Sequence, residues 1–374
     1  MKHWDAIIVG AGIIGLSLAI ELNKQGLKVL IIDKGEPGRE ASWAAGGMLV
    51  EFPLETPAAL WELASASARM YPEFVHELED ESRMKIDLRD KGAIVFVEQK
   101  KGTWHRGSSA PLQDSYRLPR PLLELEPAFD VSGHVSQLTP LFLRERSVDP
   151  RQLTAAAIAA AKHREIEFSS RDQVLAIETD DGKVTGVRTS KTRFTGGTIV
   201  NCAGAWAGQI DGNGLPALPT RPVKGQMLCV VTPYKEMIRH VIRTPEVYLI
   251  PRSDGRLLIG ATQEEAGFDK QTVPETIQEL RAAALDVVPK LADARILEAW
   301  AGLRPGTPDA LPILGATSTQ GYFVATGHFR DGIQLAPVTA RVMGQVITGE
   351  KPDFDLAAFG AGRFHKQEPV GAGC

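Results

Sequence analysis

The chain has 374 residues, with 42 Lys and Arg against 46 Asp and Glu, which gives a formal net charge of -4 at pH 7. This length exceeds the roughly 250–300 residues at which a single hydrophobic core stops growing, so we expect two domains. The acidic balance and the lack of a basic run argue against nucleic acid as a partner.

Cysteine content and hydropathy point to a cytoplasmic protein with no membrane partner. Cys202, Cys229 and Cys374 form no Cys-x-x-Cys pair and no even framework, which favours a reducing compartment without structural disulfides. Residues 6–20 are apolar, but they follow Asp5 and contain a glycine motif, so we interpret them as part of the fold and not as a signal segment. No other apolar run approaches the length of a membrane span.

The N-terminus has the pattern of a dinucleotide-binding unit. An apolar strand leads into Gly10, Gly12 and Gly15, then come a helix and a second strand over 29–32, which ends at Asp33. In such a unit the first glycine allows a sharp turn, the second lets the backbone approach a pyrophosphate, and the third allows close packing of helix and strand. The helix N-terminus would face the phosphates, and Asp33 would hold ribose hydroxyls.

Periodicity and capping residues predict the next elements. Apolar residues at helical spacing predict an amphipathic helix over 60–78, and a strand is expected over 92–97. Residues 100–121 are polar and rich in turn formers, which predicts an irregular segment. Asp149 and Pro150 then predict the start of an alanine-rich helix, with Asp as the N-cap and Pro in the first position.

Turn residues between apolar runs predict two β-hairpins, one over 174–189 around Asp180-Asp181-Gly182 and one over 247–261 around Ser253-Asp254-Gly255. The other expected elements are a strand over 198–203, a helix over 274–288, a strand over 322–325 and a helix over 333–347 with Pro337 near its start. Strands and helices alternate at both ends of the chain, whereas the middle is rich in hairpins. This arrangement predicts an α/β fold with an inserted mixed sheet.

Four motifs carry a family resemblance: the glycine fingerprint at 10–15, the run Glu40–Leu49, the stretch Trp300–Asp309 and the loop Gly327–Ile333. Together they resemble the FAD-dependent D-amino-acid oxidase family, from Asp5 to about Gly349. The resemblance implies a Rossmann-like FAD-binding domain, interrupted in sequence, and an α+β substrate-binding domain with a mixed, largely antiparallel sheet. We expect the FAD-binding domain to comprise residues 1–85, 145–218 and 305–374, and the substrate-binding domain residues 86–144 and 219–304.

The resemblance also implies which residues surround FAD. The expected cofactor contacts are Gly10, Gly12, Ile13, Ile14, Gly15, Asp33, Lys34, Ser42, Ala44, Ala45, Gly46, Gly47, Met48, Val174, Ala203, Gly204, Trp206, His328, Arg330, Asp331, Gly332 and Ile333. Core packing alone would also explain the segments at 174 and 199–204. Gly46 departs from the family, whose members more often carry Ala there, and we expect a looser loop.

Two further features concern how the flavin is held and stabilised. Sarcosine oxidases of the same superfamily tether flavin through a Cys in the stretch that corresponds to Gly302–Leu314, and this chain has no Cys there, so noncovalent FAD is expected. The last helix opens at Asp331-Gly332-Ile333, and its N-terminus carries partial positive charge suited to the anionic reduced flavin ring. An ordinary capped helix is a compatible alternative.

Arg304 is the expected anchor of the substrate carboxylate. Its guanidinium is a planar, permanently charged fork that can grip a carboxylate with two parallel hydrogen bonds, and the Pro and Gly beside it stiffen the backbone. The family resemblance assigns it this role. The alternative is a structural arginine that pairs with Asp309 or with a carbonyl oxygen.

Four other residues are expected at the substrate pocket. Tyr248 could direct its hydroxyl to the same carboxylate, or it could be a half-buried core tyrosine. Arg330 resembles the family's second pocket arginine, with a surface or phosphate-facing role as the alternative. Met48 and Gln263 would line the pocket by position.

The expected reaction is oxidative deamination of a small α-amino acid or N-alkyl glycine, such as glycine, sarcosine or D-alanine, with oxygen as the acceptor. The cofactor would carry the chemistry and the protein would place the substrate. No metal is expected, because the isolated residues His105, His134, His163, His240 and His365 lack the spacing of a metal site.

Several alternatives stay open. A D-amino-acid dehydrogenase or a sarcosine oxidase would share this architecture, and so would a noncatalytic flavin-binding module. A disulfide reductase would need a second dinucleotide fingerprint and usually a redox Cys-x-x-Cys, and both are missing from the sequence. The acidic balance argues against a part in an RNA-modifying assembly. Relatives suggest a homotetramer.

Overall fold

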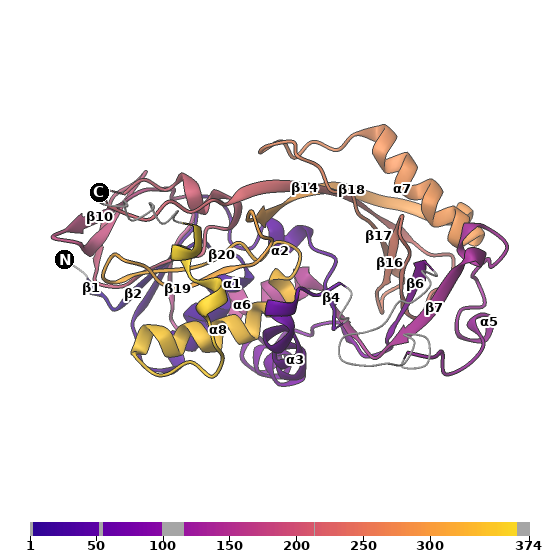
Figure 1. The fold of residues 1–374 in the computed structure, drawn as a ribbon, viewed down its shortest axis with the longest axis horizontal. Coiled ribbons are helices and arrows are strands. Elements are labelled where there is room, and N and C mark those ends of the chain that lie inside the picture. The colour runs from indigo at the N-terminus through magenta and orange to yellow at the C-terminus, as the bar shows by residue number, and fades with distance from the viewer. Residues whose placement is uncertain (1–2, 52–54, 99–115, 213, 365–374) are drawn as a thin grey trace, which may run out of the picture.

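A largely parallel six-stranded sheet forms the centre of the lobe that contains the first residues of the chain (Figure 1). The computed structural model describes residues 3–51, 55–98, 116–212 and 214–364. In order across the sheet, the strands are β19 (Ile313–Ala316), β20 (Tyr322–Thr326), β13 (Ile199–Asn201), β2 (Ala6–Val9), β3 (Val29–Ile32) and β9 (Glu167–Ser169). Only β19 runs antiparallel to its neighbour.

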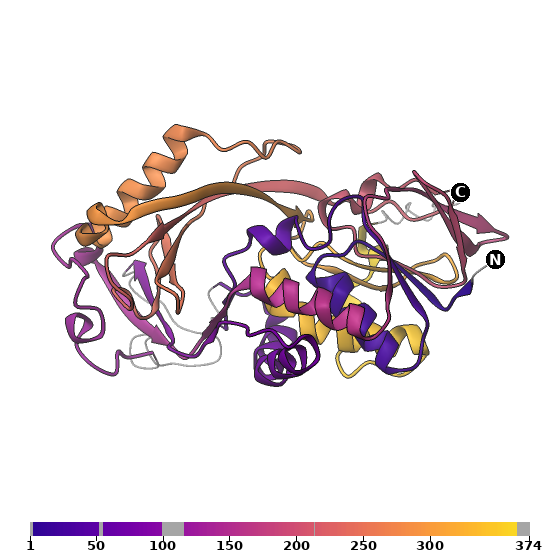
Figure 2. The same cartoon turned by 180° about the vertical axis from the view of Figure 1, so that it is seen from behind.

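The two faces of this sheet are covered differently. Alternate side chains of β2 point to opposite faces, so Ile8 packs against helices and Ile7 against a second sheet. The helices are α1 (Ile13–Lys24), α3 (Trp61–Ser82), α6 (Pro150–His163) and α8 (Gly332–Thr348), as Figure 2 shows from behind. The second sheet consists of β1 (His3–Trp4), β12 (Arg193–Gly196), β11 (Lys183–Thr189) and β10 (Val174–Asp180).

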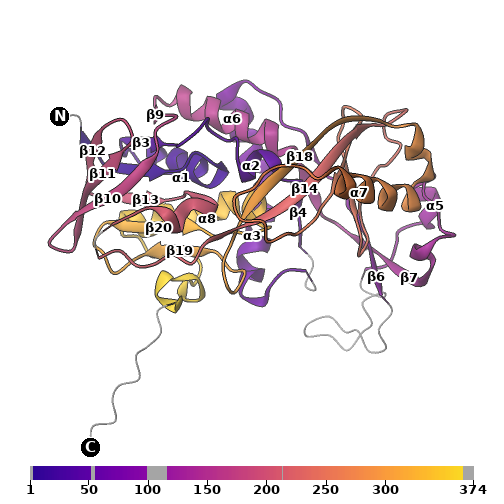
Figure 3. The same cartoon turned by 90° about the horizontal axis from the view of Figure 1, so that it is seen from above.

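A seven-stranded mixed sheet forms the other lobe. Its order is β18 (Arg295–Gly306), β14 (Arg221–Val231), β17 (Arg256–Gly260), β16 (Tyr248–Pro251), β15 (Val241–Arg243), β6 (Ala93–Glu98) and β7 (Leu138–Leu143). Helix α7 (Pro274–Val287) covers one face through Leu280 and Ala284. The long antiparallel pair of β14 and β18 runs from this lobe to the other one (Figure 3).

A small sheet and several short helical segments complete the fold. A three-stranded sheet consists of β4 (Met48–Leu49), β8 (Arg146–Val148) and β5 (Leu88–Arg89). The short helices are α2 (Ala41–Ala44) and α5 (Leu122–Leu125), and the 3-10 segments are η1 (Ala58–Leu60), η2 (His134–Gln137), η3 (Gly204–Gln209), η4 (Pro289–Asp293), η5 (Ala357–Phe359) and η6 (Ala361–Phe364). None of the described helices is both long enough and apolar enough to span a bilayer.

Capping and turn residues in the sequence correctly predicted the position of several elements. Asp149 caps α6, and its side chain accepts hydrogen bonds from the amides of Arg151 (2.9 Å) and Gln152 (3.3 Å). The hairpin β10–β11 turns through Asp181 and Gly182, both with positive φ. The predicted helix over 60–78 extends further, to Ser82.

One predicted strand is shorter in the structure, and one predicted segment lies mostly outside the described residues. The strand expected over 198–203 is shorter and covers only Ile199–Asn201. The irregular segment expected over 100–121 lies mostly outside the described residues, as do His105 and His365.

The predicted domain division remains a proposal. All strands of the six-stranded sheet come from the three segments assigned to the FAD-binding domain. Those of the seven-stranded sheet come from the other two segments, apart from the last residues of β18. Strand β5 lies in a substrate-domain segment but pairs with β8, so the boundary near residue 86 crosses a small sheet.

We predict that Gly15→Ala lowers the stability of the protein by about 1–3 kcal/mol, the usual range for forced overpacking. A Cβ atom on Gly15 would lie 2.0 Å from the carbonyl oxygen of Gly10, so helix α1 would have to move away from the glycine turn. Thermal unfolding and FAD content after gel filtration would measure the effect. Gly197→Ala is the matched control, because nothing lies within 4 Å of its Cβ position; equal behaviour of the two variants would contradict the prediction.

Candidate functional site

A cavity of about 430 Å³ lies between the two lobes and is lined by segments from both. It extends from Gly10, Gly12 and the start of α1 to Tyr248 and Arg304 in the seven-stranded sheet. The structure therefore brings the glycine fingerprint and the expected carboxylate anchor into one continuous space.

Most of the expected site residues line this cavity. They are Gly10, Gly12, Ile13, Ile14, Asp33, Lys34, Ser42, Ala44, Ala45, Gly46, Gly47, Met48, Val174, Ala203, Gly204, Trp206, Tyr248, Arg304, His328, Arg330, Asp331, Gly332 and Ile333. Gly15 is not among the lining residues; it is buried and allows close packing of α1 on the glycine turn.

Gln263 was expected to line the pocket, and the structure does not place it there. Its side chain is exposed and does not line the cavity. It follows Thr262 just beyond β17, and the backbone carbonyl of Thr262 accepts a hydrogen bond from Arg304. We leave Gln263 out of the proposed pocket.

The fingerprint end of the cavity is built from backbone amides and one carboxylate. Asp33 accepts hydrogen bonds from the amides of Ala11 (2.7 Å) and Gly35 (2.8 Å), so it fixes the glycine turn against β3. Burial raises the pKa of the Asp33 carboxyl, partly opposed by these two hydrogen bonds. The hydroxyl of Ser42 accepts a hydrogen bond from the Ile13 amide (2.9 Å), the first residue of α1. Each Asp33 oxygen keeps a second lone pair for a ligand hydroxyl.

The loop at Gly46 and Gly47 is held in place and not loosened. Gly47 has φ of +77°, and a Cβ there would lie 2.0 Å from the Val148 carbonyl oxygen, so only glycine fits. Buried Arg252 donates a hydrogen bond to the Gly46 carbonyl (2.6 Å). A Cβ on Gly46 would lie 2.6 Å from Ile250 Cδ1, so this side chain fills the space that Ala would need. The loosening expected from sequence does not agree with these contacts.

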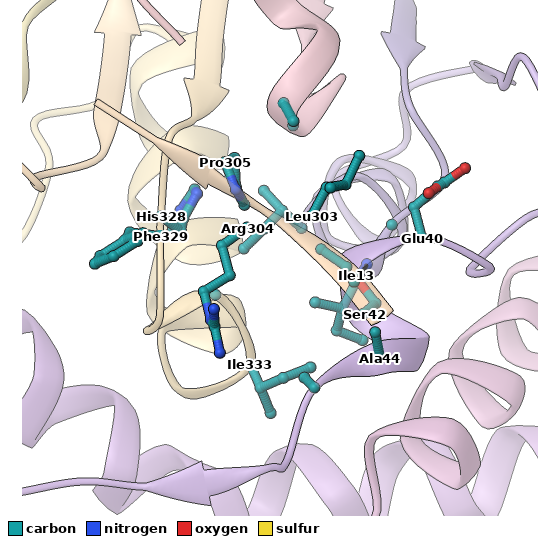
Figure 4. Close-up of a pocket in the computed structure, with 18 of the residues that line it drawn as sticks. Ile13, Glu40, Ser42, Ala44, Leu303, Arg304, Pro305, His328, Phe329 and Ile333 are labelled. Atoms are coloured by element: carbon teal, nitrogen blue, oxygen red, sulfur yellow. Dashed lines mark hydrogen bonds between the residues drawn. The ribbon is translucent and has the colours of Figure 1, made fainter. Parts of the chain in front are cut away.

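Helix α8 directs its N-terminus into the cavity. Tyr71 and Ser67 of α3 donate hydrogen bonds to the carbonyls of Ile333 and Gln334, both at 2.5 Å, and so fix the first turn. The first amides of a helix have no partner within the helix, and its N-terminus carries partial positive charge. In Figure 4 the side chain of Arg304 extends from β18 towards Ile333 at this end of α8.

His328 and Asp331 flank the start of α8. Burial lowers the pKa of His328 to about 3, so its ring is neutral, and Nε2 lies 3.1 Å from the Thr339 hydroxyl. Burial raises the pKa of Asp331 to about 6, although neighbouring Arg330 opposes this shift.

The guanidinium of Arg304 is oriented by backbone carbonyls and not by a carboxylate. Nη1 donates to the carbonyl oxygens of Thr262 (3.0 Å) and Lys224 (3.3 Å), and no carboxylate of the described residues forms an ion pair with it. Of the two alternative partners considered from sequence, backbone carbonyls do contact Arg304, whereas Asp309 is bound by Arg363 (2.8 Å). The positive charge of Arg304 is therefore available to a ligand in the cavity.

A glycine makes this placement possible. Arg304 and Gly225 lie on the same face of the β14–β18 pair, and a Cβ on Gly225 would lie 2.3 Å from Nη1 of Arg304. Gly225 also lines the cavity. The guanidinium thus lies flat across a strand that has no side chain at this point.

Tyr248 lies beside Arg304. Burial raises the pKa of its hydroxyl, whereas the charges of Arg304 and Arg330 act in the opposite direction. Tyr248 pairs with Gly260 across β16 and β17, and Gly260 pairs with Met227. Its hydroxyl lies 3.7 Å from the Met227 sulfur.

The structure adds residues that sequence reasoning missed. Gly225, Met227, Arg243 and Glu55 line the cavity near Tyr248 and Arg304. A single arginine at the end of the apolar strand Val241–Arg243 was a usable signal, because a charge in a buried strand needs a partner. The role of Glu55 had no sequence signal.

The cavity fits FAD. The N-terminus of α1 and the Gly10–Gly12 turn form a site for phosphates. Asp33 follows β3 and lines the cavity where it can bind ribose hydroxyls. A Cβ on Gly10 would lie 2.5 Å from the Cys202 carbonyl oxygen, so only glycine allows the turn between β2 and α1. No group of three His, Cys, Asp or Glu side chains suited to a metal occurs among the described residues.

This fold and cavity define a flavin-dependent oxidoreductase. Residues 5–346 match the family described as DAO, FAD dependent oxidoreductase, and the chain belongs to that family. The expected family, fold class and FAD cofactor are thereby confirmed.

Individual relatives support the same conclusion. The chain is 34% identical over 368 residues to glycine oxidase from Pseudomonas aeruginosa, covering 96% of this chain and 98% of that protein. It is 33% identical to the bifunctional protein ThiO/ThiG of Trichormus variabilis, covering 97% of this chain but 55% of that protein. The crystal structure of glycine oxidase from Geobacillus kaustophilus is 30% identical, with a TM-score of 0.88 and coverage of 98% and 100%. The expected enzyme class, an FAD-dependent amino-acid oxidase, is confirmed by these similarities.

Gly225→Ala is predicted to lower kcat/KM for oxidation of the amino-acid substrate about 100-fold, a loss typical of a misplaced binding group. The added methyl group would displace the Arg304 guanidinium, while the distant fingerprint would still hold FAD. Steady-state kinetics and the flavin absorbance spectrum measure the two effects. Parent-like kinetics would show that Arg304 need not lie across Gly225; Gly197→Ala again serves as the control.

Asp331→Asn is predicted to stabilise the protein by about 2–3 kcal/mol at pH 8 and by almost nothing near pH 4. The pKa of Asp331 is raised from 3.8 to about 6 in the folded state, so the favourable contribution of its protonated form is complete below about pH 4 and is lost as pH rises through 6. Asn cannot ionise and avoids this loss. Thermal unfolding at both pH values measures the difference, with exposed Asp286→Asn as the charge control; an equal gain at both pH values would refute the assignment.

Proposed function

We propose that this enzyme oxidises glycine and other small amines, such as sarcosine and D-alanine, with oxygen as the electron acceptor. For glycine the balanced reaction is glycine, O₂ and water to glyoxylate, ammonia and hydrogen peroxide. Sarcosine would release a primary amine in place of ammonia.

The observation that carries this proposal is the uncompensated charge of Arg304 in a cavity that also holds the dinucleotide fingerprint. An amino acid needs a cation for its carboxylate, and the fork of Arg304 can bind it with the hydroxyl of Tyr248 beside it. Arg330, which also lines the cavity, supplies a second positive charge.

The walls around Arg304 favour a small substrate. Met48, Met227 and Tyr248 line this end of the cavity, and large side chains there leave space for a short amine. The relatives from Pseudomonas aeruginosa and Geobacillus kaustophilus are named glycine oxidase, and glycine is an amine of this small size.

In this proposal the chain binds, orients and desolvates the substrate. FAD, when bound, supplies the acceptor for the electron pair released at the substrate α-carbon and passes it to oxygen. The amine must be neutral at that moment, and burial among apolar side chains lowers the pKa of an amine. The N-terminus of α8 offers partial positive charge to the flavin ring.

We extend the proposal to the biological context. The similarity to ThiO/ThiG supports a supply of glycine imine for the thiazole of thiamine. A cytoplasmic location, a homotetramer and the two-domain division given above are parts of the same proposal.

Anaerobic bleaching tests the function directly. The yellow protein is mixed without oxygen with glycine, sarcosine and D-alanine, and flavin absorbance is followed before and after air is admitted. Bleaching by these amines and rapid recolouring in air, with formation of peroxide, are expected. A flavin that none of these amines reduces would exclude the proposed substrates, and slow recolouring would favour a dehydrogenase.

Arg304→Ala is predicted to lower kcat/KM for glycine by about two to four decades, because a desolvated carboxylate without its cation loses about 3–5 kcal/mol. Arg304→Lys should restore part of the loss, since it keeps the charge but not the fork. Both variants should retain FAD. Glycine oxidation by Arg304→Ala at the parental efficiency would remove Arg304 from the carboxylate site.

A further inference from the structure

Arg243 lies next to Tyr248 on the cavity face of the seven-stranded sheet. The two residues are register partners in the antiparallel pair of β15 and β16. Partner side chains point to the same face, and neighbouring strands lie about 4.8 Å apart. Arg243 is therefore one strand further from Arg304 than Tyr248 is, and all three line the same cavity.

The guanidinium of Arg243 is buried and only partly satisfied. Its side chain is 7% exposed. Nη1 and Nη2 donate to the two carboxylate oxygens of Glu145, at 2.7 and 3.3 Å. Nε has no hydrogen-bond partner among the described residues, although it is buried. Nε is thus the nitrogen of this guanidinium that remains for a further acceptor.

The carboxylate of Glu55 lies in front of this donor. Its Oε1 atom is 3.4 Å from Nε of Arg243, an ion-pair distance without hydrogen-bond geometry. Glu55 lines the cavity, and its side chain is 34% exposed. Glu145 already balances the charge of Arg243, so the carboxylate of Glu55 adds a further negative charge, which the nearby charge of Arg330 partly offsets.

We propose that Glu55 determines substrate specificity by excluding amines that carry a second acidic group. Its carboxylate occupies the position in front of Arg243 that such a group would take. The inference rests on the proposed function, in which Arg304 and Tyr248 hold the α-carboxylate. A substrate with a neutral or absent side chain meets no repulsion there, whereas a dicarboxylic amine places a second anion beside Glu55. Without Glu55, the free donor of Arg243 would bind that anion.

D-Asparagine and D-aspartate test this proposal, because they have nearly the same size and differ by one negative charge. The parent, Glu55→Gln and Glu62→Gln are compared. Glu62 is exposed on α3 and does not line the cavity, so its variant controls for the loss of one charge from the same part of the chain. Assays are run at about pH 8, since burial raises the pKa of Glu55 and its carboxylate must be ionised.

The parent is expected to prefer D-asparagine. Glu55→Gln should raise the ratio of kcat/KM for D-aspartate to that for D-asparagine about tenfold, as expected when a like charge beside an anion is removed. Glu62→Gln should leave the ratio unchanged. The double variant Glu55→Gln, Arg243→Lys should lose most of the gain, because lysine lacks the Nε donor of the guanidinium. An unchanged ratio in Glu55→Gln, or a parent that prefers D-aspartate, would overturn the proposal.

A binding measurement separates this proposal from the proposed function. Succinate and succinamate, which differ by one charge, are titrated into the flavin-bound proteins, and their dissociation constants are taken from changes in flavin absorbance. Glu55→Gln should tighten succinate relative to succinamate about tenfold. If no amine reduces the parent, the proposed function fails, but this comparison still decides the role of Glu55. No relative tightening of succinate would refute that role.

Discussion

A positive charge that the protein orients but does not neutralise is central to this structure. Arg304 is held by two backbone carbonyls, which direct its guanidinium without cancelling its charge. The nearby acid in sequence, Asp309, is bound by Arg363 instead. A carboxylate partner inside the protein would have competed with the substrate, because a buried ion pair is hard to break. The arrangement therefore keeps a binding site for an anion ready in the cavity.

The long strands β14 and β18 place this charge. They connect the two lobes (Figure 3), and Arg304 lies two residues before the end of β18. The amide of Phe329 donates to the carbonyl of Pro305 (3.0 Å), which ties the end of β18 to the loop before α8. The same strand pair thus fixes the substrate anchor relative to the helix whose N-terminus faces the proposed flavin position.

The register of β15 and β16 places a second arginine, Arg243, on the cavity wall. Tyr248 and Arg243 are opposite each other, so the cavity wall continues from the carboxylate anchor to a second arginine. That arginine differs from Arg304 because Glu145 and Glu55 surround it. The two guanidinium groups on this face of the sheet therefore have different surroundings. That of Arg304 is suited to bind an anion, whereas the carboxylates around Arg243 repel one.

The sequence alone located the dinucleotide unit and the residues most specific to the family. The fingerprint at 10–15, the cap at Asp149 and the turn at Gly182 are local signals, because each reflects a constraint on a few adjacent residues. The family motifs added Arg304 and the helix start at Asp331. Sequence did not reveal β14, since its strand is buried on both faces and shows no alternation, and it wrongly brought Gln263 to the pocket.

Tertiary structure decided which charges are free. Whether Arg304 pairs with Asp309 depends on Arg363, 54 residues beyond that acid in the chain, and whether Arg243 is satisfied depends on Glu145 and Glu55. The space for Arg304 depends on a missing Cβ at Gly225 on the neighbouring strand. These contacts join residues far apart in sequence, and a charge or a cavity is the sum of such contacts. Local pattern determines where strands and helices begin, but only the packed chain determines what a side chain is able to bind.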